Sequence, residues 1–261
     1  MKRPTVAASL GRLAGLLLIS LLSMQLYFVG RIALMAVLDP QSTTFQRSEM
    51  WRLLTERGQV LWSQQWMPYG RISPHLKRAV IASEDAGFSD HSGVEWDALD
   101  QAWSRNQKAE ARADKANQRI EQREASGSKP ATATATVQPK VVGGSTITQQ
   151  LAKNLFLSGE RNLPRKAQEF LVTFMLEALL SKQRILEIYL NNVEWGEGVF
   201  GAEAAARHYF HGPAQALGPT QAAQLAVMLP APKRFEKRLG SAYVAGRAGT
   251  VVARMGGVEV P

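Results

Sequence analysis

The 261-residue sequence contains no cysteine. Disulfide bonds and every metal site built from thiolate ligands are therefore excluded. Histidine cannot replace those ligands, because His91 has no second histidine at a spacing that suits a metal ion.

Acidic residues are outnumbered: 22 aspartates and glutamates face 31 lysines and arginines, a net charge of +9. Such a charge suggests a polyanionic partner or an anionic membrane surface. No zinc-ligand spacing or RNA-binding signature accompanies it, so we expect no nucleic acid partner.

Charge is absent from one segment, residues 13–30, and after Arg31 the apolar run continues over residues 32–38. A membrane-spanning helix needs about 20 apolar residues. We therefore expect a cytoplasmic stub and transmembrane anchor at residues 1–38. By the positive-inside rule, the N-terminus is cytoplasmic and the rest lies outside, because three basic residues precede the run: Lys2, Arg3 and Arg12.

A cleaved signal peptide is the alternative interpretation of this segment. The run is longer than the apolar part of a usual signal peptide, and residues 33–36 (ALMA) are a poor cleavage site. Both observations favour an uncleaved anchor.

Residues 39–65 are polar with scattered aromatic residues, which indicates a juxtamembrane region. Residues 66–261 form the expected main domain, with a low-complexity insert at 104–140. Its first half could form a charged helix, and its second half is expected to be disordered. Four aromatic residues would suit either a membrane interface or core packing: Trp51, Trp62, Trp66 and Tyr69.

The main domain lacks alternating strand patterns outside the insert, so we predict an all-α fold. Residues 191–201, which carry three glycines, are expected to form a tight, ordered loop. Helices are predicted over residues 74–85, 94–103, 182–190, 202–210 and 221–229, and after residues 147 and 164.

Glu84 is the first candidate for chemistry. It follows Val80 by one turn on the helix that begins at Ser73-Pro74, close to the apolar face. A carboxylate there has a raised pKa, which suits a general base. Alternatively, Glu84 and Asp85 form a solvated helix end, although a helix C-terminus disfavours negative charge.

The loop after Glu84 holds an aromatic residue and a histidine between two glycines. Phe88 and His91 lie between Gly87 and Gly93. We interpret His91 as a hydrogen-bonding support, because it has no partner for metal binding.

Residues 143–154 (GGSTITQQLAKN) predict a glycine turn that leads into a helix. Ser145 or Thr146 can cap this helix and leave its first N–H groups free for an anion. An apolar stripe follows at Ile147, Leu151 and Leu155. Other side chains fall beside that stripe and stay available: Gln149, Gln150, Lys153 and Asn154. The alternative is an ordinary capped amphipathic helix.

Four cations lie within fourteen residues: Lys153, Arg161, Arg165 and Lys166. Beside a helix start, they would form a good diphosphate site. The helix that follows Pro164 has a predicted buried stripe of Ala167, Phe170, Leu171, Phe174, Met175 and Ala178. Arg165 and Glu169 lie one turn apart off that stripe, where an exposed pair would contribute only a few tenths of a kcal/mol.

Five segments in this order resemble the motifs of the peptidoglycan glycosyltransferase family, which also supplies the polymerising domain of bifunctional penicillin-binding proteins. They are residues 84–93 (EDAGFSDHSG), 143–154, 165–169 (RKAQE), 184–210 and 221–232. The resemblance covers about residues 66–255 apart from the insert. With an anchor and no transpeptidase domain, the chain is most similar to monofunctional members.

The resemblance implies a lysozyme-like, all-α fold that polymerises lipid II into β-1,4-linked glycan strands and releases undecaprenyl diphosphate. It implies an inverting single displacement with Glu84 as general base and Glu169 as a second catalytic acid. The four cations would bind the diphosphate. Nine further residues would contact substrate: Asp85, Phe88, His91, Gly144, Ser145, Thr146, Gln149, Gln150 and Asn154.

The same resemblance implies no organic cofactor. Glu169 either orients Arg165 and Lys166 or helps to hold a divalent cation, Mg²⁺ or Mn²⁺. The expected partners are lipid II, the growing glycan strand, the membrane, and penicillin-binding or division proteins. The expected location is the inner membrane, with a periplasmic catalytic domain.

Two departures from the family pattern stand out. The insert separates the first two motifs widely, and Gln221 replaces a common acid, which we interpret as structural. A peptidoglycan hydrolase or lytic transglycosylase and an inactive membrane-anchored scaffold remain as rival functions.

Overall fold

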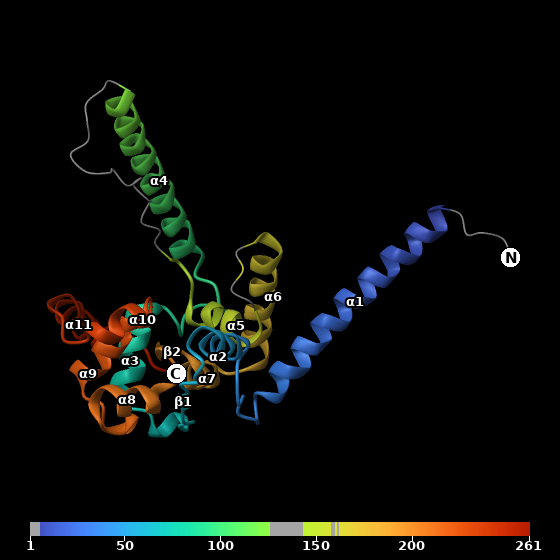
Figure 1. Ribbon diagram of the computed structural model, residues 1–261. Helices are drawn as coiled ribbons and strands as arrows, with labels where there is room; N and C mark the ends of the chain where they lie inside the picture. Colours follow the sequence, from blue (N-terminus) through green and yellow to red (C-terminus); the bar gives the residue numbers. More distant parts are fainter. Residues whose placement is uncertain (1–5, 126–142, 158–159, 161) are drawn as a thin grey trace. The chain divides into compact units, whose positions relative to one another are not determined.

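A computed structural model of the chain describes residues 6–125, 143–157, 160 and 162–261 (Figure 1). The chain divides into two compact units. We call residues Met1–Gly93 with Ile147–Pro261 the main unit, and Val94–Thr146 the second unit. The Arg161 side chain and the second half of the predicted insert, from Ser126 to residue 142, lie outside the described residues.

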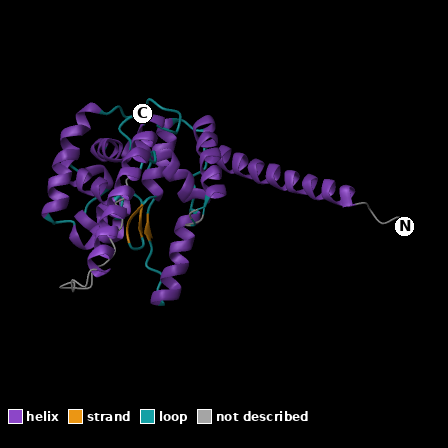
Figure 2. Ribbon diagram, turned by 90° about the horizontal axis from the view of Figure 1, so that it is seen from above, coloured by secondary structure: helices purple, strands orange, loops and turns teal. Residues whose placement is uncertain are grey.

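Helices dominate both units, which confirms the all-α prediction (Figure 2). The helices of the main unit are α1 (Val6–Leu34), α2 (Thr44–Arg57), α3 (Pro74–Glu84), α5 (Ile147–Phe156), α6 (Leu163–Leu179), α7 (Lys182–Asn192), α8 (Ala202–Phe210), α9 (Pro219–Met228), α10 (Pro232–Phe235) and α11 (Ala242–Arg254). Short 3₁₀ turns cover Tyr69–Arg71, Ala214–Ala216, Glu236–Arg238 and Met255–Gly257.

A small sheet replaces the loop that the sequence predicts at residues 191–201. Its strands are β1 (Ser63–Gln64), β2 (Glu194–Gly196) and β3 (Val199–Phe200), in the order β1-β3-β2. β3 pairs antiparallel with β2 and parallel with β1. Gly201 adopts φ +82°, and a Cβ there would lie 2.6 Å from the Asn191 carbonyl oxygen. The segment is ordered as expected, but strands this short leave no alternating pattern.

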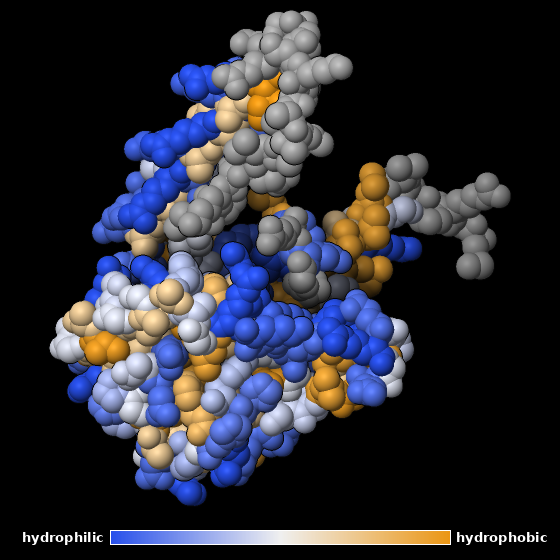
Figure 3. Space-filling view, turned by 60° about the vertical axis from the view of Figure 1, so that its left-hand side comes forward, coloured by the Kyte–Doolittle hydropathy of each residue, from blue (hydrophilic) through white to orange (hydrophobic). Residues whose placement is uncertain are grey.

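The apolar N-terminal segment forms α1, as predicted. Its residues Ser9–Leu34 make one helix of 26 residues with a mean hydropathy of 1.9, and only 6% of its most apolar part is buried. Figure 3 colours α1 mostly as hydrophobic. The low burial excludes the core helix of a soluble domain, whereas the last turns bury Phe28 and Ile32.

α5 is surrounded by other helices of the main unit. It packs against α2, α6 and α7, while α3 packs against α9 and α11. The predicted stripe Ile147, Leu151 and Leu155 is buried, as expected. The largest side chains of the core include Trp195, Tyr189 and Phe88, all fully buried.

The predicted stripe on α6 is wrong. The buried residues are Glu169, Val172, Thr173 and Leu176, whereas Leu171 and Phe174 are exposed. This helix is apolar on both sides, so periodicity does not tell which side faces the core. Polar groups on the buried side find partners inside the unit, since the Thr173 hydroxyl donates to the Glu169 carbonyl at 2.8 Å.

The second unit contains α4 (Trp96–Ala125), one helix of 30 residues. The sequence predicted a short helix over residues 94–103, followed by a separate charged segment. No glycine or proline interrupts residues 96–125, and alanine, arginine, glutamate, glutamine and lysine favour helix. The charged segment therefore continues the same helix, and Figure 3 shows many hydrophilic side chains along it.

Candidate active site

Glu84 is the last residue of α3. The helix begins as predicted, because the Ser73 side chain accepts from the His75 N–H and Pro74 takes the first helical position. The Gln150 Nε2 donates to the Glu84 Oε2 at 2.9 Å. Burial raises the pKa of the Glu84 carboxyl, hydrogen bonds from Gln150 and Ser83 lower it, and the Asp85 charge raises it. The net increase agrees with the sequence-based expectation for a general base.

Gln150 is held in one orientation by a tyrosine of α7. The Tyr189 hydroxyl donates to the Gln150 Oε1 at 2.9 Å, so the amide nitrogen must face Glu84. Tyr189 is fully buried, and burial raises its pKa well above the usual value. The hydroxyl therefore keeps its proton and remains a donor. Tyr189 could not be selected from the sequence, where its only visible feature is its place in a helical pattern.

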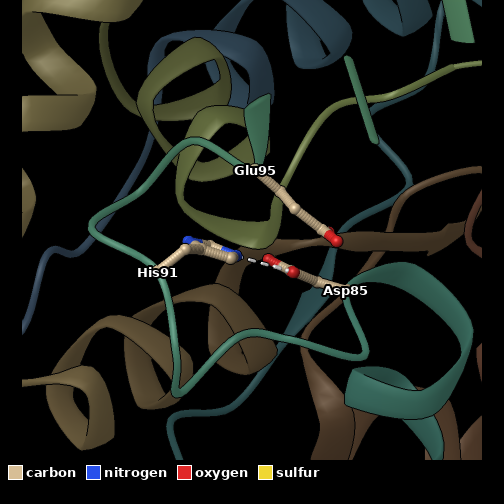
Figure 4. A group of neighbouring side chains, drawn as sticks. All are labelled: Asp85, His91 and Glu95. Atoms are coloured by element: carbon tan, nitrogen blue, oxygen red, sulfur yellow. Dashed lines mark hydrogen bonds and ion pairs between the residues drawn. The ribbon is translucent and has the colours of Figure 1, made fainter. Parts of the chain in front are cut away.

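Asp85 accepts two hydrogen bonds, one on each oxygen. The His91 Nε2 lies 2.8 Å from the Asp85 Oδ1 (Figure 4; Glu95, also drawn, belongs to the second unit). The Gly93 N–H donates to the His91 Nδ1 at 3.1 Å, so Nε2 carries the proton and donates to Asp85. His91 is therefore a hydrogen-bonding support, as predicted.

The other Asp85 oxygen accepts a hydrogen bond from the start of α5. The Ile147 N–H, the first of this helix, donates to the Asp85 Oδ2 at 2.9 Å. The expectation of free N–H groups is wrong for this donor, because a carboxylate of the protein itself already accepts from it. A helix N-terminus stabilises any nearby anion, and here the anion is internal.

The glycine pair before α5 belongs to the second unit. A Cβ at Gly144 would lie 2.9 Å from the Ala102 Cβ and 3.2 Å from the Ala98 carbonyl oxygen. Gly144 is therefore required for close packing on α4 rather than for a positive φ. Ser145 and Thr146 are in the same unit, and the predicted contacts of these three residues with substrate stay predictions.

The side chains expected beside the α5 stripe differ in exposure. Gln149 is buried, which contradicts the expectation that it stays available, while Lys153 is exposed and Asn154 is half-buried. Gln149 is buried because α5 packs against helices on several sides, which widens its buried face beyond one stripe.

Glu169 holds two of the predicted cations. It is buried, and its Oε2 accepts from the Arg165 Nη1 at 3.0 Å while its Oε1 pairs with the Lys166 Nζ. The alternative of an exposed surface pair is therefore excluded. The Asn162 side chain caps α6 by accepting from the Arg165 N–H at 2.9 Å, which places both cations in the first turns.

A group around Glu177 supports this region and was missed by the sequence analysis. The Thr148 hydroxyl donates to the Glu177 Oε1 at 2.6 Å, and the Lys182 Nζ donates to the same oxygen at 2.9 Å. Lys182 also donates to the His91 carbonyl and lies 4.6 Å from the centre of the Phe88 ring. Phe88 is thus an internal support of the His91 loop, and its predicted contact with substrate stays a prediction.

Comparison with known proteins decides the family. The family model described as Transglycosylase matches residues 52–116 and 127–256. A biosynthetic peptidoglycan transglycosylase of Burkholderia thailandensis is 50% identical over 240 residues, 92% of this chain and 83% of the relative. Those of Burkholderia pseudomallei (47%; 100% and 91%) and Paraburkholderia phytofirmans (45%; 100% and 97%) are similar along the whole chain.

The chain belongs to the biosynthetic peptidoglycan transglycosylases. Its activity is that of a peptidoglycan glycosyltransferase in cell wall biosynthesis, which confirms the resemblance of the five motifs. The family match begins at Arg52, inside α2, and passes over residues 117–126, which fall in the predicted insert. The division at residues 65/66 between a juxtamembrane region and the main domain stays a prediction.

In this transglycosylase, the first and second sequence motifs meet through side chains. Gln150 contacts Glu84, and Asp85 contacts both His91 and the start of α5. The third motif forms the Glu169 group on α6, which packs against α5. In the fifth motif, Gln221 is structural, as predicted, because its Oε1 accepts from the Gly218 N–H at 3.1 Å at the start of α9.

Proposed function

We propose that this transglycosylase polymerises lipid II. The 4-hydroxyl of the acceptor sugar attacks the anomeric carbon of the donor, a β-1,4 bond forms with inversion, and undecaprenyl diphosphate leaves. The hydroxyl proton passes to a base. The observation that carries this proposal is the Glu84 carboxylate, which is half-buried, has a raised pKa and is oriented by Gln150.

Glu84 acts as the general base. A base works best when its pKa lies close to the working pH, and burial moves the pKa of Glu84 in that direction. The hydrogen bond from Gln150 opposes this shift and keeps the carboxylate ionisable.

The leaving group needs charge neutralisation rather than a proton, because a diphosphate is already a weak base. We assign this task to Arg165 and Lys166, with Lys153 and Arg161 as further cations. Support comes from α6, where buried Glu169 fixes the first two cations on one turn. We assign Glu169 the role of a positioning acid for these cations.

The alternative role of Glu169, as a ligand of Mg²⁺ or Mn²⁺, fits the arrangement less well. Both carboxylate oxygens already contact cationic side chains of the same helix. A divalent cation would have to displace one of them and would meet the repulsion of the other. We propose a reaction that uses neither this ion nor an organic cofactor.

We propose that α1 anchors the enzyme in the inner membrane, with a cytoplasmic N-terminus and a periplasmic main unit. Support comes from the length and exposure of α1 and from α6, which contacts α1. The outward side of α6 exposes apolar residues that suit a lipid environment: Leu163, Leu171, Phe174 and Leu179. Contacts with penicillin-binding or division proteins stay a prediction.

The experiment is incubation of the purified full-length enzyme with fluorescent lipid II, followed by gel analysis of the glycan strands. The wild type should yield polymer, and Glu84→Gln should lower the rate by about 10²–10⁴-fold, the usual contribution of a general base. Lipid II binding by the variant, measured separately, should persist. Substantial polymerisation by Glu84→Gln would remove Glu84 from the base role.

Two rival functions predict different outcomes in the same assay. A hydrolase or lytic transglycosylase would cleave polymeric peptidoglycan and would not need a diphosphate-linked donor. Its leaving group is the alkoxide of a sugar, which a general acid protonates. An inactive scaffold would produce neither polymer nor fragments.

A further inference from the structure

A cavity of about 370 Å³ lies where α1 ends and α2 begins, away from Glu84 and Glu169. Two cations line it, Arg31 from the last turn of α1 and Arg47 from α2. The wall of the cavity also contains Leu34, Leu38 and Asp39. None of these residues belongs to the proposed reaction.

Neither guanidinium is neutralised by an acid of the described residues. The Arg31 Nη1 donates to the Tyr27 hydroxyl at 3.1 Å, and its guanidinium lies 5.8 Å from the centre of the Tyr27 ring. Arg47 donates to uncharged oxygens of Ser42 and Thr44. Asp39, the acid in the wall, is paired with the Arg184 Nη2 at 2.8 Å, and Arg184 also pairs with Glu187 at 2.8 Å. The cavity therefore presents two guanidinium groups without an acid of their own and keeps a net positive charge, which attracts phosphate oxygens.

The position of the cavity along α1 indicates which phosphate is available. At 1.5 Å per residue, the 26 residues Ser9–Leu34 would span about 39 Å, longer than a hydrocarbon core of about 30 Å. With α1 as the anchor, as proposed above, the last turn with Arg31 lies in the layer of lipid head groups.

The surroundings also suit a lipid. A neighbouring cavity of about 210 Å³ shares Pro40 and Gln41 with the first and is lined by Trp62 and Trp66. Tryptophan favours the head-group layer of membranes. The rim of the first cavity is apolar and open, because Leu34 and Leu38 are 54% and 57% exposed. A free phosphate ion would gain nothing from that rim, whereas acyl chains would contact it.

We propose that this cavity binds the phosphate group of an anionic phospholipid of the outer leaflet. Arg31 and Arg47 donate to the phosphodiester oxygens, and Leu34 and Leu38 contact the acyl chains. This proposal rests on the membrane anchor and not on the identity of the glycosyl donor or of the base.

The test uses the full-length enzyme in detergent micelles that contain equal amounts of phosphatidylglycerol and phosphatidylcholine, and native mass spectrometry counts the lipids that stay bound. The wild type should retain phosphatidylglycerol at least about tenfold over phosphatidylcholine, because two charge-assisted contacts favour the anionic lipid. Arg31→Gln/Arg47→Gln should lose this preference.

The matched control is Arg71→Gln/Arg78→Gln, which removes two positive charges from exposed positions of the main unit. It should keep the preference. An equal loss in both double variants, or no preference in the wild type, would overturn the proposal. Displacement of phosphatidylglycerol by millimolar inorganic phosphate would also overturn it, in favour of a free-phosphate site.

A fold control completes the test. If the Arg47 substitution lowers the melting temperature, Arg31→Gln alone is used, since its only hydrogen bond within the described residues goes to Tyr27. Glycan synthesis is not the readout, so failure here leaves the proposed reaction untouched, and failure of that reaction leaves the lipid measurement valid.

Discussion

At the scale of single residues, two opposing influences act on Glu84. Burial raises the pKa of its carboxyl, and the amide of Gln150 lowers it by donating to the charged form. The amide can donate only if its nitrogen faces Glu84, and the Tyr189 hydroxyl enforces that orientation. One buried hydroxyl thereby influences the proton affinity of the proposed base from a distance.

Replacing Tyr189 with phenylalanine tests this relation. Without the hydroxyl, the Gln150 amide can turn its oxygen toward Glu84, which disfavours the carboxylate and raises the pKa of Glu84 further. The acidic limb of the pH–kcat profile should shift to higher pH. Activity near neutrality should fall, and it should recover at alkaline pH.

Tyr209→Phe is the matched control, because the Tyr209 hydroxyl makes a similar hydrogen bond to the Trp195 carbonyl at 2.8 Å. Its pH profile should follow the wild type. A uniform drop in kcat at every pH for Tyr189→Phe would indicate general structural damage and would contradict the positioning role.

Glu194 on β2 is a buried carboxyl that takes no part in the proposed chemistry. Burial raises the pKa of Glu194 to about 7, although the Lys233 ammonium, whose Nζ lies 3.5 Å from the Glu194 Oε1, opposes the shift. A raised acid pKa means that the folded state binds the proton more tightly than the unfolded state. The resulting stability is present at low pH and is lost as pH rises through the folded pKa.

Between about pH 4.5 and pH 7, ionisation of Glu194 lowers the free energy of unfolding of the wild type by up to about 3 kcal/mol. We expect Glu194→Gln to remove this part of the pH dependence. The variant should gain stability relative to the wild type at pH 8. Thermal unfolding in detergent at several pH values measures this. Parallel curves for both proteins would show that Glu194 does not titrate in this range.

At the scale of elements, the start of α5 illustrates what a sequence shows and what it hides. The helix and the stripe Ile147, Leu151 and Leu155 follow from local pattern alone, whereas the predicted glycine turn is wrong, because residues 143–146 form no turn. The anion at its N-terminus does not, because Asp85 precedes Ile147 by 62 residues. Sequence patterns report the neighbours of a residue along the chain, whereas hydrogen bonds of this kind depend on how helices pack.

α6 shows the same limit of sequence patterns, in this case for the prediction of its buried side. Four of the six residues of its predicted stripe are exposed and two are half-buried. The buried side also carries apolar residues, Val172 and Leu176, so the apolar pattern does not tell which side faces the core. Glu84, Asp85, His91 and Glu169 could be selected from residue types and motif order. Tyr189 and Lys182 could not, because each acts on a site residue from another helix.

The Asp85–α5 contact leads to a prediction about the stability of this element. Asp85→Ala removes an acceptor from His91 and from the Ile147 N–H. Hydrogen bonds to a charged group contribute about 1.5–3 kcal/mol each, so we expect a loss of roughly 3 kcal/mol or more.

The measurement is the melting temperature of the purified enzyme, together with amide hydrogen exchange in residues 147–156. Exchange should accelerate at the first turn of α5 in Asp85→Ala. The control, Asp90→Ala, changes an exposed acid of the same loop and should change neither quantity. Unchanged protection at Ile147 would show that the helix start does not depend on Asp85.

At the scale of the whole molecule, the chain divides into two units, with Glu84 in the main unit and α4 in the second unit. The hydrophobic core of the main unit is built from residues before Gly93 and after Thr146 among those described. α4 instead carries many charged residues along its 30 positions. Glu84 and Gln150, which flank the second unit in sequence, are nonetheless joined by a hydrogen bond. The contact that orients the proposed base thus lies within the main unit.

We therefore expect a chain without residues 106–138 to fold and to polymerise lipid II at a rate within about threefold of the wild type. None of the described residues that are removed belongs to the hydrophobic core of the main unit, and a shorter connection costs less closure entropy. The deletion retains Gly144 and the first turns of α4, including Ala98 and Ala102, which pack closely. A deletion of residues 94–142 is the informative comparison, because it removes that packing as well. If the shorter deletion melts like the wild type but makes no glycan, residues 106–138 take part in catalysis or substrate delivery. If instead both deletions melt early, residues 106–138 are needed for the stability of the main unit, which contradicts this prediction.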